Sequence, residues 1–555
     1  MGRTLLTIFF VFCSVISWAQ AVKGVPPAAA KAMQSIDPEK LRPHVKFLAS
    51  DLLEGRGTGQ RGGDLAAAYI ASQFEQYGLT PAGANGTYLQ PVPLVLIAPQ
   101  PQTTFAIVPP SGPPIELKYR DDYVALDQTA SAASDVDAGI VYMGYGISAP
   151  EYQWDDYKGT DVRGKVLLML VNEPPSDDPR FFQGPALTYY GRWSYKYEEA
   201  ARRGAAGVLL IHKTDMASYG WEVVRNSNAI EKAQLVNDPE AKLKVASWVQ
   251  FDVARRIVAE SGKNLEQLMQ EARSRDFRPV ALQVRLKAHM VSRVRRSRSD
   301  NVLAILPGSD PHLKDEAVLY TAHYDHLGIQ PDQSGDNIYN GAADNATGCA
   351  ILLELARAYA EAGVRPARSV LFAAVTGEEQ GLRGSEYLGK HPPLAAGKIT
   401  LDLNYDDLPP IGDPEEAGTF GAERTSFYAT VQQTAREFHL QLQPDPDPSA
   451  GSYYRSDHFS LARAGIPAFS ISEGRKFKGH TRDWGDQQAA EFNAKRYHQP
   501  SDQYDPAMDF SGNARMARFG FVLGWRAASQ RELVGWNPGD EFEAARRKSR
   551  ASGSH

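Results

Sequence analysis

The chain has 555 residues, of which 43% are hydrophobic and 23% charged, and its net charge is −6. This balance is ordinary for a globular protein and excludes a largely disordered chain, a collagen-like rod and a disulfide-rich miniprotein. The length corresponds to roughly three or four average domains, or to two larger ones. Because the chain is slightly acidic and has no basic field, we expect no nucleic acid as a partner.

The N-terminal segment 1–21 is predicted to be a secretory signal peptide. Arg3 supplies a positive charge, the stretch from Leu5 to Ile16 is almost entirely apolar, and small residues follow at cleavage spacing. This stretch is shorter than the ~20 residues of a spanning helix, so we expect no stable membrane insertion and disfavour a membrane anchor. The pattern predicts a secreted or periplasmic protein. Once the segment is removed, Cys349 is the remaining cysteine, and its apolar helical surroundings predict a packed thiol.

The mature chain is predicted to contain a catalytic domain interrupted by a smaller module. Its first part, residues 22–116, begins with helical patterns and continues into a proline-rich stretch at 91–114 that predicts an irregular connection. Residues 117–285 change in texture, with short β-like runs around a helix at 195–203, and predict a separate β-rich module. The catalytic domain resumes over 286–540, and 541–555 is expected to be a flexible tail.

From residue 300 onward, strand and helix patterns alternate along the chain. Such alternation predicts an α/β fold, a three-layer arrangement with helices on both faces of a sheet. A helix is expected at 346–359. The strand candidates are 302–306, 317–322, 369–375, 399–403 and 468–472.

Polar residues collect where these predicted strands end, which is where open α/β sheets place their sites. His323 and Asp325 follow one strand and are two residues apart, so on extended chain they point the same way. A carboxylate beside an imidazole can fix its tautomer and leave the other nitrogen free for a metal. Asp344 is surrounded by small residues at the start of the predicted helix, where a plain helix cap is the alternative. Glu378 and Glu379 follow another buried strand, and such adjacent carboxylates are costly unless a cation or proton lies between them.

Two further motifs complete the set. Asp406 follows the strand at 399–403, with Asp402 and Asp407 as alternative carboxylates nearby, and His498 lies in a turn-forming stretch. Each of these residues taken alone could be structural. Together they supply two imidazoles and several carboxylates, which is the ligand inventory of a two-metal site.

The ordered series of these motifs resembles the di-zinc aminopeptidase family, which also includes aminopeptidase Y and relatives of glutamate carboxypeptidase. Further matches are the stretches 48–57, 456–459 and 464–467, so the likeness covers nearly the whole mature chain. The middle segment, with Gly144-Tyr-Gly-Ile147 and Asp161-Val-Arg-Gly-Lys-Val166, resembles the protease-associated domain often inserted in such enzymes.

The resemblance implies two zinc ions per chain and a role for each matched residue. One ion would be bound by His323 and Asp406 and the other by Glu379 and His498, with Asp344 bridging them. Glu378 would be the general base, Asp325 the partner of His323, and Tyr497 a residue that steadies the tetrahedral intermediate.

The function expected from these roles is a zinc-dependent exopeptidase that releases N-terminal residues from peptide substrates. A carboxypeptidase, in which an arginine such as Arg455 would hold the substrate carboxylate, is an alternative on the same fold. A glutaminyl-cyclase-like enzyme or a non-catalytic binding protein is a further alternative, but both are disfavoured because no ligand position is lost.

Overall fold

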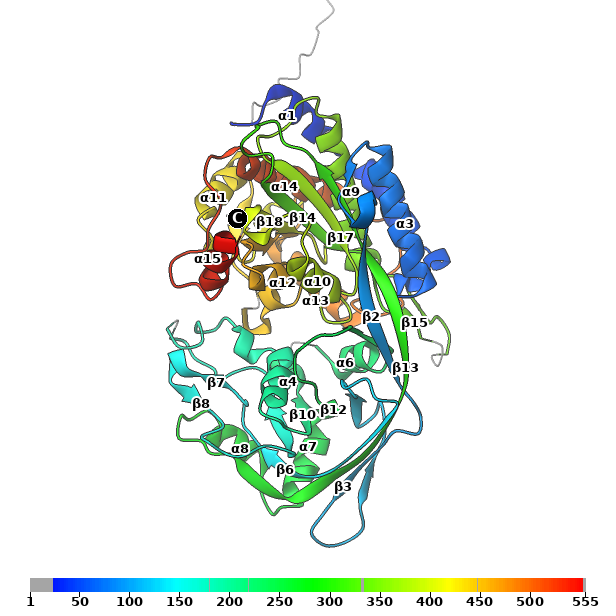
Figure 1. Cartoon of the computed structure of the whole chain (residues 1–555), viewed down its shortest axis with the longest axis vertical. Helices are drawn as coiled ribbons and strands as arrows, with labels where there is room; N and C mark the ends of the chain where they lie inside the picture. The colour runs from blue at the N-terminus through cyan, green and yellow to red at the C-terminus, as the bar shows by residue number, and fades with distance from the viewer. Residues whose placement is uncertain (1–22, 179, 218, 331–333, 447, 553–555) are drawn as a thin grey trace, which may run out of the picture.

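The structure, a computed structural model, describes residues 23–552 except 179, 218, 331–333 and 447. It consists of an upper and a lower lobe, named as they lie in Figure 1, and long strands run from one lobe to the other. The segment predicted to be a signal peptide lies outside the described residues. Within the described part of the chain, no helix is both long and apolar enough to cross a bilayer.

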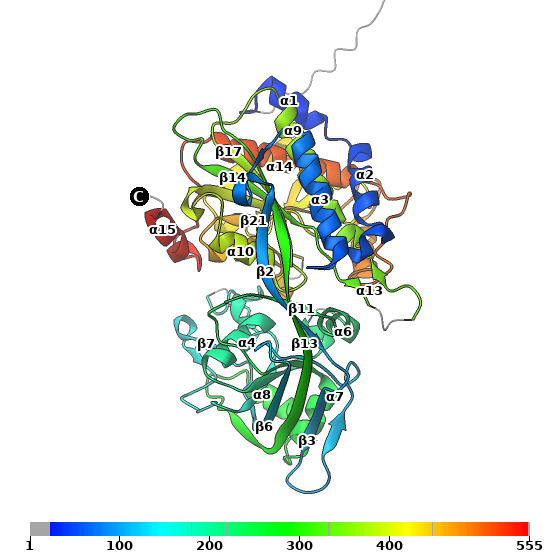
Figure 2. The same ribbon diagram turned by 45° about the vertical axis from the view of Figure 1, so that its right-hand side comes forward.

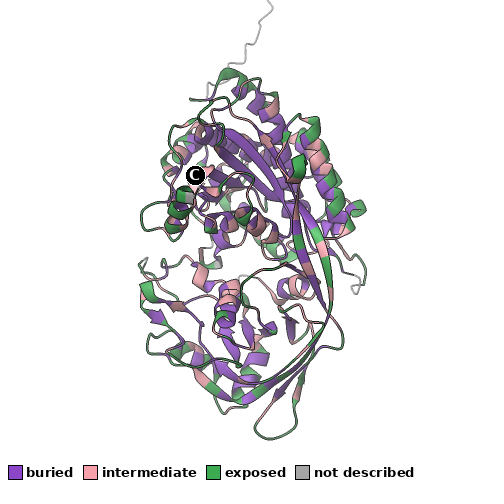
Figure 3. Ribbon diagram, in the orientation of Figure 1, coloured by how far each residue is buried: buried purple, intermediate pink, exposed green. Residues whose placement is uncertain are grey.

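The upper lobe is built on a sheet whose central strands are parallel. The order β21-β18-β14-β17-β13 places β14 (Ala317–His323) between β17 (Ser369–Val375) and β18 (Ile399–Asn404), with β21 (Ala468–Ser470) beyond β18. Only β13 (Val280–Leu306) runs antiparallel among these strands. Every residue of β14, β17 and β18 is buried (Figure 3), as expected of parallel strands covered on both faces.

Helices cover both faces of this sheet, so the predicted three-layer α/β fold is confirmed. One face packs against α1 (Pro27–Gln34), α2 (Pro38–Leu48), α3 (Arg61–Gln76), α9 (Thr347–Glu361), α11 (Tyr428–Glu437) and α14 (Ser511–Ser529). The opposite face packs against α10 (Arg383–Lys390) and α12 (His458–Arg463). Further elements of this lobe are β1 (Thr80–Pro81), β15 (Gly328–Ile329), β16 (Ile338–Tyr339), β19 (Glu416–Gly418), β20 (Gln441–Gln443), β22 (Ser472–Glu473), α13 (Arg482–Lys495) and α15 (Glu543–Ser552).

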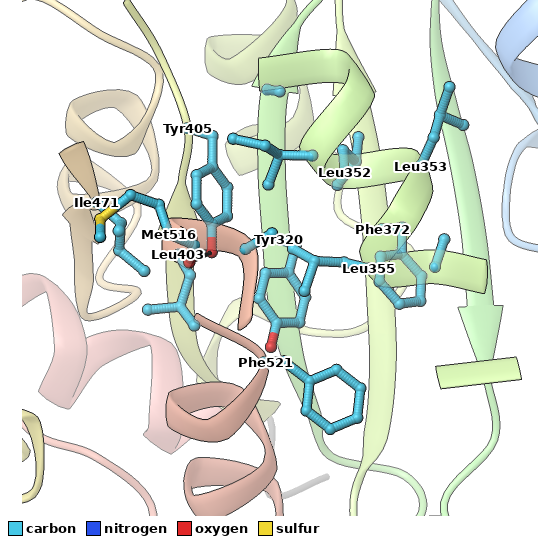
Figure 4. Close-up of a cluster of buried hydrophobic side chains, with 14 of the residues drawn as sticks. Tyr320, Leu352, Leu353, Leu355, Phe372, Leu403, Tyr405, Ile471, Met516 and Phe521 are labelled. Carbon is cyan, nitrogen blue, oxygen red and sulfur yellow. Dashed lines mark hydrogen bonds between the residues drawn. The ribbon is translucent and has the colours of Figure 1, made fainter. Parts of the chain in front are cut away.

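The core of the upper lobe is aromatic where α9 and α14 meet the sheet (Figure 4). Tyr320 of β14 stacks on Phe372 of β17, with ring centroids 5.7 Å apart. The Tyr320 hydroxyl donates to the backbone oxygen of Gly520 in α14. A side chain is excluded at Gly524 in the same helix, because a Cβ there would lie 1.9 Å from the Tyr320 hydroxyl oxygen. Small residues of α14 therefore let this helix lie close on the sheet.

The lower lobe has a second sheet with helices on each face. Its strands lie in the order β13, β6 (Ala133–Tyr142), β9 (Val166–Leu170), β10 (Gly207–His212), β12 (Val245–Gln250) and β5 (Tyr123–Leu126), and β3 (Thr104–Val108) and β4 (Ile115–Leu117) are added beside β13. The helices α7 (Phe251–Ala259) and α8 (Leu265–Glu271) pack on one face, and α4 (Trp193–Arg202) and α6 (Trp221–Asn228) on the other. The remaining elements are β7 (Ser148–Ala149), β8 (Trp154–Asp155) and α5 (Thr214–Ala217).

The two sheets share β13, which is 27 residues long. Its first half pairs with β6 and β3 in the lower lobe, and its second half pairs with β2 (Leu89–Pro99) and β17 in the upper lobe. A short strand after α6, β11 (Lys232–Leu235), pairs with the free side of β2. These strands tie the lobes together at their junction (Figure 2).

The proline-rich stretch 91–114 is not the irregular connection that the sequence predicts, since it contains β2 and β3. The backbone oxygen of Pro93 accepts a hydrogen bond from Val236, on the side away from β13. Alternate residues of a strand present their backbone groups to opposite edges. Pro91 and Pro93 are two residues apart, so both present their backbone groups to the edge away from β13, and the missing N–H groups are on that edge. The pairing with β13 is therefore retained.

Two other expectations about organisation differ from the structure. The lower-lobe sheet includes β3, which begins at Thr104, before the predicted module boundary at 117. The predicted flexible tail 541–555 includes the helix α15, where Arg546 is buried and donates to backbone oxygens of Ile399 and Val534. Cys349 is a buried free thiol, as predicted.

Candidate metal centre

The ends of the parallel strands bring the predicted ligands together. His323 is the last residue of β14, Glu379 lies in the loop after β17, and Asp406 follows β18. Asp344 lies in the irregular turn at 342–346 that precedes α9, and His498 lies between α13 and α14. All five side chains converge on one buried region, although His498 is far along the chain from the others.

The first group of possible ligands consists of His323, Asp344 and Asp406. The Nε2 atom of His323 lies 2.9 Å from Asp406 Oδ1 and 3.4 Å from Asp344 Oδ1. One ligand atom from each residue falls within 4.8 Å of the others, which is a spacing that a single ion could span.

The second group lies on the other side of Asp344. The Nε2 atom of His498 is 3.2 Å from Asp344 Oδ2 and 3.2 Å from Glu379 Oε2. Asp344 thus turns one carboxylate oxygen toward His323 and the other toward His498. This is the disposition that a bridging carboxylate requires.

A third histidine, His326, belongs to the second group although sequence reasoning gave it no role. Its Nδ1 lies 2.7 Å from Glu379 Oε1 and 3.8 Å from Asp344 Oδ1. Together these three residues form another cluster within 4.8 Å. The available signal was its position three residues after His323, in the segment that follows the same strand.

Burial and mutual attraction set the charges of these groups. Burial lowers the pKa of His323, but Asp406 outweighs it and holds that pKa well above its usual range. Burial likewise lowers the pKa of His498, and Glu379 and Asp344 raise it well above normal. Burial raises the pKa of Glu379, but His498 and His326 hold it well below its usual range.

Cations fit this donor set. In the described part of the chain, Nε2 of His326 is buried and has no hydrogen-bond partner, and the buried atoms His326 Nδ1 and Glu379 Oε1 lie 2.7 Å apart without forming a well-aligned hydrogen bond. Buried polar atoms without partners are rare in native proteins and call for a ligand. Imidazole nitrogens and carboxylate oxygens are donors that zinc accepts, and other divalent ions accept them too.

Among the three aspartates near the end of β18, contact with His323 is made by Asp406. Asp402 lies within the strand and accepts a hydrogen bond from Thr321 Oγ1 at 3.0 Å. Asp407 is exposed and lines the adjoining cavity.

The three residues predicted to be catalytic surround the ligand groups. Asp325 accepts hydrogen bonds from Thr58 Oγ1 at 2.7 Å and from the Glu378 backbone at 3.2 Å. The Nδ1 atom of His323 is 3.1 Å from the Asp325 backbone oxygen and 3.9 Å from the carboxylate, so the backbone oxygen is the nearer partner. Asp325 therefore also anchors the loop that carries Glu378.

Glu378 is half-buried and lines the cavity beside Asp406. Burial raises the pKa of Glu378 well above its usual range; His323 opposes this and the neighbouring carboxylates of Glu379 and Asp406 add to it. Tyr497 stacks on His498, with ring centroids 4.0 Å apart, and also lines the cavity.

The cavity has a volume of about 1010 Å³ and lies between the lobes. Its wall in the upper lobe includes His323, Glu378 and Tyr497. Its wall in the lower lobe includes Arg192, Tyr219 and Ser227. The lower lobe, which is the module inserted between the two parts of the upper lobe, therefore forms one wall of the cavity that contains the ligand groups.

Comparisons with known proteins show what this fold and this cluster of side chains are similar to. Residues 301–519 match the family model described as Peptidase family M28. This part of the chain is therefore similar to peptidase family M28. The matched region lies after the inserted module, which the match does not classify.

Curated relatives match over part of their length. The chain is 31% identical over 224 residues to leupeptin-inactivating enzyme 1 of Streptomyces exfoliatus, covering 39% of this chain and 46% of that protein. It is 39% identical over 107 residues to a probable zinc metalloprotease of Pyrenophora teres f. teres, covering 19% of this chain and 22% of that protein. The matches thus span less than half of these relatives.

A solved structure shows the same fold over most of the chain. The aminopeptidase from Aneurinibacillus sp. strain AM-1 aligns with a TM-score of 0.53 and 18% identity, covering 92% of this chain and 98% of that one. This likeness supports the α/β fold, inserted module included.

Proposed function

We propose that this protein is a zinc-dependent aminopeptidase that binds two zinc ions and releases N-terminal residues from peptides. The observation that carries the proposal is the position of Asp344, whose Oδ1 faces His323 and whose Oδ2 faces His498. His323 and Asp406 would hold one ion, and Glu379 and His498 the other. His326 is an additional candidate donor for the second ion, because it lies against Glu379.

Bound there, a pair of divalent cations would activate a water molecule and polarise the peptide carbonyl. The carboxylate of Glu378 takes the proton of the attacking water and returns a proton to the leaving amine. Asp325 holds the Glu378 backbone in place, and we assign to Tyr497 the task of steadying the carbonyl oxygen.

A carboxypeptidase is the second candidate, and the cavity gives it a specific observation. Arg192 and Arg455 both line the cavity that contains the ligand groups. Arginine binds carboxylates with paired hydrogen bonds, so these side chains offer a place for the C-terminal carboxylate of a short peptide.

The relatives' names agree with metal-dependent peptide hydrolysis, and the N-terminal pattern of residues 1–21 supports a secreted or periplasmic location. The inserted module would be a protease-associated domain, on the strength of its sequence motifs. Peptides are the substrates that we propose for the cavity.

Metal analysis and a panel of blocked peptides test these proposals together. We expect about two zinc ions per chain, and cleavage of peptides that have a free N-terminus whether or not the C-terminus is amidated. Cleavage that survives N-acetylation but is abolished by C-terminal amidation would favour the carboxypeptidase. A protein that binds no metal and cleaves none of these peptides would refute both enzymes.

A further inference from the structure

A serine of the inserted module touches one of the candidate metal ligands. The hydroxyl oxygen of Ser227, in α6, lies 2.8 Å from His498 Nδ1. The other nitrogen of that ring, Nε2, faces Asp344 and Glu379. If Nε2 donates its lone pair to a metal, Nδ1 must carry the proton and donates it to Ser227 Oγ. Ser227 is therefore placed to fix both the tautomer and the orientation of His498.

A lysine of the same module holds the backbone of a second candidate ligand. The ammonium of Lys232, at the start of β11, donates to the backbone oxygen of Glu379 at 2.8 Å. It also donates to the backbone oxygen of Ser227 at 3.0 Å. One side chain thus links the end of α6 to the loop that carries Glu378 and Glu379.

Neighbouring hydrogen bonds make this junction firm. The backbone N–H of Ala233 donates to Gln380 Oε1 at 3.0 Å, and Arg383 Nε donates to the Ala233 backbone oxygen at 3.3 Å. Because β11 pairs with β2, this segment is anchored in the strand ladder of the upper lobe. Figure 2 shows α6 and β11 at the junction of the lobes.

From these contacts we infer that the inserted module completes the metal centre, with Ser227 and Lys232 acting as positioning residues for His498 and Glu379. The inference rests on the proposed function, since it assigns these residues to the second of the two proposed ions. Neighbours of metal-bound histidines that hold the ring in place typically contribute about 10–100-fold in metal affinity or activity. The module would then position two metal ligands in addition to forming a wall of the cavity.

A purely structural role would give a different result from a positioning role. If Ser227 and Lys232 only docked the module, their loss would lower the free energy of unfolding without weakening zinc once the protein is folded. Zinc affinity of the folded full-length protein, measured against a competing chromophoric chelator, separates these two roles and does not depend on turnover.

The test compares Ser227→Ala, Ser227→Thr and Lys232→Met with the wild-type protein. Ser261→Ala is the matched control, because Ser261 in the same module also accepts a 2.8 Å hydrogen bond, from the Gln283 backbone, and contacts no candidate ligand. We expect Ser227→Ala and Lys232→Met each to weaken the second zinc ion about 10-fold or more. Ser227→Thr keeps a hydroxyl group, so its zinc affinity should be closer to that of the wild type than the affinity of Ser227→Ala is. Ser261→Ala should bind zinc as tightly as the wild type does.

Thermal unfolding of the metal-free variants establishes whether each is folded. If Ser227→Ala does not fold, the zinc affinity of Lys232→Met tests the inference instead. Wild-type zinc affinity in both folded variants would overturn the inference and leave the proposed function standing. Failure of the wild-type protein to bind zinc would overturn the proposed function, and this inference with it.

Discussion

Asp344 and His498, separated by most of the C-terminal half of the chain, meet at 3.2 Å between Oδ2 and Nε2. The other oxygen of Asp344 faces His323 at 3.4 Å. Asp344 is thereby the one carboxylate that contacts both histidines at these distances among the described ion pairs. Its substitution is the most direct probe of a shared ligand.

The variant Asp344→Asn should lower zinc binding at both positions, because an amide keeps the shape of the side chain but loses its charge. We expect fewer than two ions per chain and a loss of turnover of about 100-fold or more. Metal analysis of the purified protein with kcat measurements checks both. Asp300→Asn, a buried aspartate outside the ligand groups, is the control and should keep its zinc. Full metal content in Asp344→Asn would contradict the bridging role.

The variant Glu378→Gln should separate metal binding from proton transfer. Glutamine preserves the size of the side chain but cannot accept a proton, and general acid–base catalysis typically contributes about 10²–10⁴-fold. We expect kcat to fall by that factor while zinc content stays at the wild-type value. Glu75→Gln, at an exposed position of α3, serves as the control. Wild-type turnover by a metal-loaded Glu378→Gln enzyme would reject the assignment.

His44 should make the fold sensitive to acid. Burial, and next the nearby Arg357, lower the pKa of His44 to about 4, whereas an unfolded histidine titrates near 6.5. The unfolded state therefore binds more protons between these values, so stability is lost as pH falls from about 6.5 toward 4. One such group contributes at most about 1.4 kcal/mol per pH unit in this window.

Urea unfolding at pH 7 and pH 4.5 checks this expectation by comparing the wild type with His44→Gln. The free energy of unfolding should fall less on acidification in the variant than in the wild type. His312→Gln, at an exposed position, should lose as much stability as the wild type. Equal losses in all three proteins would show that His44 does not titrate as described.

The variant Gly520→Ala should destabilise the upper lobe. A Cβ at this position would lie 1.7 Å from the hydroxyl oxygen of Tyr405, which is fully buried and precedes Asp406. Overpacking of this kind costs about 1–3 kcal/mol, which exceeds the helical advantage of alanine over glycine. Gly535→Ala, where a Cβ meets open space, should be close to neutral in the same denaturant titration. A Gly520→Ala protein as stable as Gly535→Ala would contradict this packing.

The strands that carry the site could be predicted closely from their own residues. The run 369–375 is a strand with the predicted bounds. The predicted strands 317–322 and 399–403 each end one residue before the strands in the structure do. Such short apolar runs are strands because both of their faces are buried, and a local pattern reports burial directly. The polar residues that follow them were expected at one sheet edge, since parallel strands end on the same side.

Other features could not be predicted from the sequence, because they depend on which distant segments become neighbours in the fold. The prolines of β2 predict a loop unless it is known which edge of the strand pairs with β13. His326 lies close to His323 in the sequence, but the sequence does not show that its side chain turns toward Glu379. The contact of Ser227 with His498 joins two lobes across 271 positions. The sequence by itself determined the α/β fold and the ligand types, because apolar periodicity and residue chemistry are local. Only the tertiary structure decided which nitrogen meets which oxygen, because those distances are set by how the two lobes pack.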